Sequence, residues 1–112
     1  MNQTFFVALD RPAAACNVSA VVGDQFAVAI VIYEADGDEA PADLDFATAS
    51  LELVRCGVKE ITVAGVIEDG KATFDLDGKN FACLVGRSAL RVKLTRDGRT
   101  VTVVDGSFTV SR

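Results

Sequence analysis

The most reactive side chains in this sequence belong to three cysteines, Cys16, Cys56 and Cys83. They lie far apart and form no Cys-x-x-Cys pair, so the spacing typical of zinc sites and of thioredoxin-like redox motifs is missing. The chain also contains no histidine, which excludes Ser-His-Asp triads, histidine metal sites and the usual base that activates a cysteine nucleophile. One disulfide with a leftover thiol is an alternative, but we favour three reduced, mostly buried thiols that pack as small hydrophobic side chains.

Carboxylates gather in residues 34–45, an acid-rich segment that contains Asp36, Asp38, Glu39, Asp43 and Asp45. Such a cluster could satisfy a hard cation such as Ca²⁺, but its spacing matches no defined calcium loop, and we predict a long solvated loop instead. Paired carboxylates could also hydrolyse glycosides, yet the chain has no Trp and one Tyr to serve as a sugar platform. No glycine-rich phosphate loop is present. We therefore predict no catalytic residue, no cofactor and no metal ion.

The overall charge limits the partners. The 112 residues carry 11 Lys+Arg and 16 Asp+Glu, a formal net charge of −5, and so acidic a chain is not expected to bind nucleic acid or an anionic membrane surface. The longest apolar run, residues 26–33, is well short of the ~20 residues that a transmembrane helix requires. The apolar residues 5–9 are too few for a signal peptide and follow no Lys or Arg. We expect a strand there, in a protein that folds where it is synthesised.

The charge is distributed unevenly along the chain. Residues 1–54 contain nine acidic residues and one basic residue, a net charge of −8, whereas residues 55–112 contain seven acidic and ten basic residues, a net charge of +3. Halves of opposite sign could favour head-to-tail assembly of several copies. The alternative, which we favour, is that strands from both halves interleave in one fold and average the charge.

The apolar residues alternate with polar ones, which is typical of half-buried β-strands. Residues 89–95 and 100–104 flank Asp97-Gly98, and residues 61–67 and 71–76 flank Asp69-Gly70, so we predict two hairpins, because Asp-Gly suits a two-residue turn. Further strands are expected at residues 3–9, 18–22, 50–54 and 107–111, with a bulge or kink at Asp105-Gly106. The continuous apolar run at residues 26–33 predicts a central strand covered on both faces.

These signals predict an all-β fold in a single domain, residues 1–112. Seven to nine short strands with turn signals every 8–12 residues are typical of a two-sheet antiparallel β-sandwich, and a small barrel is the alternative. The predicted core consists of the apolar residues on the inward phase of each strand: Phe26, Val28, Ile30, Ile32, Leu51, Leu53, Phe74, Leu76, Leu90, Val92, Leu94, Val101, Val103, Phe108 and Val110.

The order of features over residues 22–111 resembles the immunoglobulin-like N-terminal domain of phage upper-baseplate and tail-fibre proteins. In that family a Gly-Asp start precedes the first core strand, here Gly23-Asp24-Gln25 before residues 26–33, and a loop leads into a strand that resembles residues 44–53. A phenylalanine-bearing strand follows, matched by residues 70–76. The close of the family pattern is matched by residues 86–92, the Asp97-Gly98 hairpin and Gly106-Ser107-Phe108-Thr109-Val110.

This resemblance implies an immunoglobulin-like sandwich that serves as a non-catalytic structural module of a phage virion, in the tail, the baseplate or the head surface, and that is made in the host cytoplasm. Family members usually head a longer, trimeric chain, so this chain is expected to be a stand-alone piece or part of a longer protein. The implied partners are other copies of the chain or other phage structural proteins. The alternative is a bacterial surface or secreted immunoglobulin-like domain, or a carbohydrate-binding module.

If the protein acts by association, the sequence offers one candidate interface. Five basic residues lie outward on or beside the second predicted hairpin, where the acidic first half of another copy could meet them: Arg87, Arg91, Lys93, Arg96 and Arg99. The terminal strand, residues 107–110, carries no charge and no Pro that would prevent pairing at a sheet edge. We therefore expect a homo-oligomer, or a partner docked on this hairpin, with an affinity that falls as salt rises.

Overall fold

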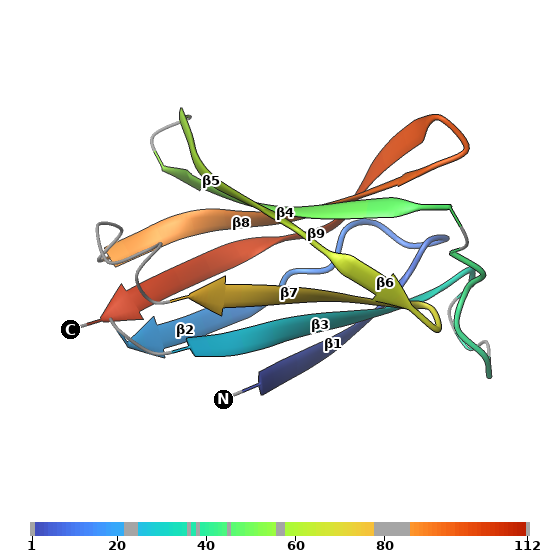
Figure 1. The fold of residues 1–112 in the computed structure, drawn as a ribbon, viewed down its shortest axis with the longest axis horizontal. Helices are drawn as coiled ribbons and strands as arrows, with labels where there is room; N and C mark the ends of the chain where they lie inside the picture. The colour runs from blue at the N-terminus through green and yellow to red at the C-terminus, as the bar shows by residue number, and fades with distance from the viewer. Residues whose placement is uncertain are drawn as a thin grey trace.

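The chain folds into two β-sheets that lie face to face, as the computed structural model shows (Figure 1). The structure describes residues 2–21, 25–35, 37, 39–44, 46–55, 58–77 and 86–111, with side chains except at 2, 25–26, 55, 58–60 and 77. The four-stranded sheet has the order β1 (Asn2–Ala8), β3 (Gln25–Tyr33), β7 (Lys71–Asp77), β6 (Val66–Glu68). The five-stranded sheet has the order β2 (Asn17–Val21), β9 (Arg99–Ser111), β8 (Gly86–Arg96), β4 (Thr48–Arg55), β5 (Val58–Ala64). The predicted two-sheet sandwich is confirmed.

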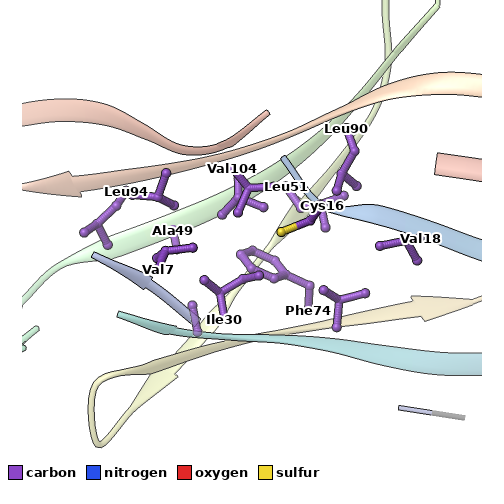
Figure 2. Close-up of a cluster of buried hydrophobic side chains, with 14 of the residues drawn as sticks. Val7, Cys16, Val18, Ile30, Ala49, Leu51, Phe74, Leu90, Leu94 and Val104 are labelled. Carbon is purple, nitrogen blue, oxygen red and sulfur yellow. The ribbon is translucent and has the colours of Figure 1, made fainter. Parts of the chain in front are cut away.

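The core fills the space between the sheets with the inward side chains of each strand. The ring of Phe74 lies at its centre, with Ile30 on its own sheet and Leu51 on the facing sheet (Figure 2). Every predicted core residue whose side chain is described is buried, except Val101; the side chain of Phe26 lies outside the described part. Alternation therefore assigned the inward face of the strands correctly.

Val101 was predicted to be buried and is 47% exposed. It pairs with the buried Leu94 across the β8–β9 hairpin, so its phase is as expected. The end of this hairpin, however, curves away from the other sheet (Figure 1). Period-2 alternation predicts the face of the sheet on which a side chain lies, but it does not predict whether another element covers that side chain.

The irregularity of β9 lies at Val103 and not at the predicted Asp105-Gly106. The β8–β9 register shifts between Val92 and Lys93: Val92 pairs with Val104 and Lys93 with Thr102. Val103 is therefore an extra residue, and both it and Val104 are buried. A bulge of this kind turns two successive side chains toward one face, which is why the sequence analysis missed Val104.

Both predicted hairpin turns are confirmed. Asp69 and Gly70 have φ values of 53° and 74°, and Asp97 and Gly98 have values of 54° and 75°, as a type I′ turn requires. The strand expected at residues 61–67 is instead divided at Gly65 into β5 and β6, which belong to different sheets. A Cβ at Gly65 would lie 2.7 Å from the Phe74 ring, so the chain changes sheets where no side chain would fit.

The first strands give the sandwich its parallel pairings. β1 pairs with β3 and β2 pairs with β9 in parallel, whereas the other described pairs are antiparallel as predicted. Residues 107–110, predicted to form an open edge, are covered by β2, because β9 lies between β2 and β8. The strand β3 does occupy an interior position, but it is fully buried on one face only, a point developed below.

Candidate protein-interaction surfaces

The predicted basic interface lies on β8 and its turn to β9; we call it the basic hairpin. The exposed Arg87 and Arg91 and the half-buried Lys93 project from the outer face of the five-stranded sheet, because Leu90, Val92 and Leu94 point inward. Arg96 and Arg99 flank the turn and pair with each other in register. The five predicted residues therefore lie on one hairpin. Arg96, however, was predicted to point outward and instead contacts Glu34 and Asp43.

Two of these cations are paired within their own sheet. Lys93 Nζ lies 3.3 Å from Glu52 Oε2, and Arg91 Nε lies 3.8 Å from Asp105 Oδ1. Asp105 is the β9 residue directly opposite Arg91, and Glu52 lies opposite Arg91 on β4. The outer face of this sheet thus carries alternating charges that compensate one another.

Arg96 is also paired within the chain, with residues of the acid-rich segment. Its guanidinium donates to both carboxylate oxygens of Glu34, at 3.3 Å for Nη2 to Oε2, and also to the backbone carbonyl oxygen of Asp43 at 3.3 Å. This hydrogen bond lowers the pKa of Glu34 below its ordinary value and raises the pKa of Arg96. Arg96 therefore ties the hairpin to residues 34–43, and the acidic counter-surface expected on another copy lies partly in the same chain.

The interleaved arrangement of the two halves explains this compensation. Each sheet combines strands from residues 1–54 with strands from residues 55–112. Of the five residues of the basic hairpin, Arg87 and Arg99 make no ion pair with another residue that the structure describes, so these two are the most accessible of the five to a partner.

A second surface, which the sequence analysis did not single out, is the outer face of the four-stranded sheet. Its outward apolar residues form what we call the apolar sheet face: Phe6, Ala8, Ala27, Ala29, Val31, Tyr33 and Val66. Phe6 and Val66 are 66% and 65% exposed, and the rings of Phe6 and Tyr33 lie 6.5 Å apart. The apolar run at residues 26–33 was the signal for this surface: it predicted cover on both faces, and within the described chain one face has none.

The segment between β3 and β4 forms a hollow beside the β6–β7 turn. Residues that line it include Pro41, Leu44, Phe46 and Ile67. Phe46 is fully exposed and has a φ of 63°, unusual for a bulky residue. Asp36, Asp38 and Asp45 of the acid-rich segment lie outside the described residues, and among those described no three His, Cys, Asp or Glu side chains are placed to hold a metal ion.

Cys16 is the one cysteine that the structure describes, and it is a buried free thiol. Burial raises its pKa, which keeps the thiol protonated and unreactive. Cys56 and Cys83 lie outside the described residues. In the described part of the chain no helix is long and apolar enough to span a membrane.

The arrangement of strands is similar to that in solved structures. The N-terminal domain of phage TP901-1 ORF48 superimposes on the chain with a TM-score of 0.66 at 15% sequence identity, and the match covers 100% of both chains. The chain shares its fold with a phage protein domain. An uncharacterized protein from Bacillus anthracis str. Ames matches at a TM-score of 0.46 and 12% identity, over 93% of this chain and 89% of that one. No family model and no curated protein matches the sequence.

Proposed function

We propose that the protein is a structural module of a phage virion, in the tail, the baseplate or the head surface, that acts by protein–protein association and not by catalysis. The observation that carries this proposal is the match to the phage TP901-1 ORF48 domain along the whole of both chains. The molecule's surfaces fit such a role. It presents an exposed apolar sheet face and a basic hairpin, whereas its described thiol is buried and protonated.

We propose further that the sandwich is immunoglobulin-like, and its strand order supports this. Immunoglobulin-type sandwiches place strands A, B, E and D in one sheet and C, F and G in the other. The order β1-β3-β7-β6 corresponds to the first set, and β4-β8-β9, extended by β5 and β2, corresponds to the second. The parallel pairing of β1 with β3 departs from an all-antiparallel arrangement.

The partners of such a module are other copies of the chain or other phage structural proteins, and its site of action is the virion. Association in a particle is multivalent, so individually weak contacts suffice to hold a component in place. A small domain with modest contact surfaces is suited to that setting.

Particle composition tests the proposal directly. Virions of the phage that carries this gene would be purified through a density gradient and probed with an antibody raised against the folded chain, with a known capsid protein as the positive control. We expect the chain to co-migrate with intact particles and to remain after a wash in high salt. Detection in the infected-cell lysate but never in particles would contradict a virion role.

A further inference from the structure

We infer that the apolar sheet face packs against the same face of a second copy, so that the two four-stranded sheets form a two-fold dimer. The inference deepens the proposed function, on which it rests, because it names the surface and the partner of the association. It moves the interface away from the basic hairpin, which lies on the opposite sheet.

The chemistry of the two outer faces differs in a way that favours this surface. On β3, the four outward side chains with described burial are Ala27, Ala29, Val31 and Tyr33, none of them charged. The outward positions of β8 instead include Arg87, Arg91 and Lys93. Apolar area removed from water is the main source of association free energy, and the small Ala27 and Ala29 leave the centre of the face flat enough for a second sheet at the usual ~10 Å.

The register of the four-stranded sheet makes the face complementary to itself. Ala29 on β3 pairs with Thr73 on β7, and both point outward. A two-fold axis that passes over this pair, parallel to the sheet and perpendicular to its strands, sets β3 over β3 and β7 over β7 in opposite directions. Residues two positions before the axis then face residues two positions after it.

Two contacts follow from that geometry, and each occurs twice in the dimer. Lys71 of one copy faces Asp75 of the other, which joins opposite charges, and Val31 faces Ala27, which joins a larger side chain to a smaller one. Lys71 and Asp75 are both exposed, and neither forms an ion pair with another residue that the structure describes. Charge and size therefore both match when the partner is a second copy.

The size of the face sets the strength of the dimer. The strands β1, β3, β7 and β6 contain 7, 9, 7 and 3 residues. At about 3.3 Å per residue and about 4.8 Å between strands, they give a face of about 410 Å², or about 820 Å² for both copies. Interfaces of that size lie below the standard range and are weak. We therefore expect a dissociation constant on the order of 0.1 mM for the isolated chain.

Charge reversal with reciprocal rescue tests the inference. Lys71→Asp sets two carboxylates against each other at this contact, and Asp75→Lys sets two ammonium groups against each other, so each variant alone should bind itself at least about tenfold more weakly. A mixture of the two variants, and the double variant Lys71→Asp/Asp75→Lys, should recover the wild-type affinity because opposite charges meet again. Sedimentation equilibrium of the full chain up to about 1 mM covers the expected range.

Two further variants serve as controls for the charge reversals. Arg87→Asp makes the same charge reversal on the opposite sheet and should leave the dimer unchanged. Val66→Lys, at a 65% exposed position on the same face, should weaken the dimer without affecting the core. Urea unfolding of each variant shows whether it has folded, so that Val66→Lys replaces any charge variant that has not.

Three results would overturn the inference: a wild-type chain that stays monomeric to about 1 mM, single variants that dimerise as the wild type does, or a loss of dimer on Arg87→Asp that equals the loss on Lys71→Asp. A monomeric chain that is still found in particles would refute the dimer and leave the proposed function standing. If the chain dimerises with the expected rescue but is absent from particles, the dimer stands and the proposed function is refuted.

Discussion

Replacing Gly106 with alanine tests how the start of the chain is attached to the five-stranded sheet. A Cβ at Gly106 would lie 1.9 Å from the carbonyl oxygen of Cys16, a backbone atom that cannot move alone. The segment 14–16 must therefore shift away from β9. It is held there by three backbone hydrogen bonds: Ala14 N to Val103 O at 3.1 Å, Asp105 N to Ala14 O at 2.9 Å, and Ser107 N to Cys16 O at 3.1 Å.

The cost follows from those contacts. At about 1 kcal/mol for each hydrogen bond, and with the buried Cys16 side chain displaced as well, we expect Gly106→Ala to lower the free energy of unfolding by about 3 kcal/mol, measured as the urea midpoint at constant m-value. Gly98→Ala is the matched control: a Cβ there meets nothing within 4 Å, so only the φ of 75° opposes it, at about 1 kcal/mol. If Gly106→Ala costs no more than Gly98→Ala, the close approach of residues 14–16 to β9 is refuted.

Three further outcomes are expected. Leu90→Ala and Leu94→Ala, each at a side chain 1% exposed, should each cost about 2–5 kcal/mol in urea unfolding, and losses below about 0.5 kcal/mol for both would show that the alternation is phased wrongly. Replacing Cys16, Cys56 or Cys83 with Ser should leave self-association unchanged in sedimentation, with a modest stability loss at the buried Cys16, and an obligatory disulfide would contradict this. Because the folded-state pKa of Glu34 is lowered by Arg96, its stabilising effect is present above the ordinary glutamate pKa and is lost as pH falls through the lowered value. Glu34→Gln should therefore remove part of the loss of stability that occurs as the pH falls below the ordinary glutamate pKa, by less than about 1 kcal/mol because the pair is exposed, and an unchanged pH profile would exclude the pair.

Local patterns predicted the parts of the fold that depend on neighbouring residues. The two Asp-Gly turns are fixed by the positive φ that both positions require, and the inward residues of β4 and β8 follow from alternation. The position of Gly106 could not be understood in that way. Its missing side chain makes room for Cys16, about 90 residues earlier in the chain, and a contact at that separation leaves no local pattern.

The division of residues 61–67 between two sheets was hidden for a similar reason. Ile61, Val63 and Ile67 all pack on the core, so their phase alone indicates one strand. The break at Gly65 depends on the ring of Phe74, which lies on another strand. The bulge at Val103 likewise arises from the pairing of β9 with β8 and is visible only in the register.

The candidate interfaces show the same limit, because a basic residue in the sequence does not reveal whether it is already paired. Lys93, Arg91 and Arg96 each have a carboxylate within the chain, so a partner that binds the basic hairpin must share or displace those contacts. A partner that covers the apolar sheet face displaces only water from Phe6, Val66 and the two strands between them, β3 and β7. Hydrophobic burial changes little with salt, whereas the attraction between exposed charges weakens as salt rises, because the Debye length is ~10 Å at 0.1 M and shorter at higher salt. The Lys71–Asp75 contacts of the apolar sheet face also weaken in high salt, but its hydrophobic burial does not. A self-association that weakens in part and persists in high salt therefore favours the apolar sheet face, and one that disappears favours the basic hairpin.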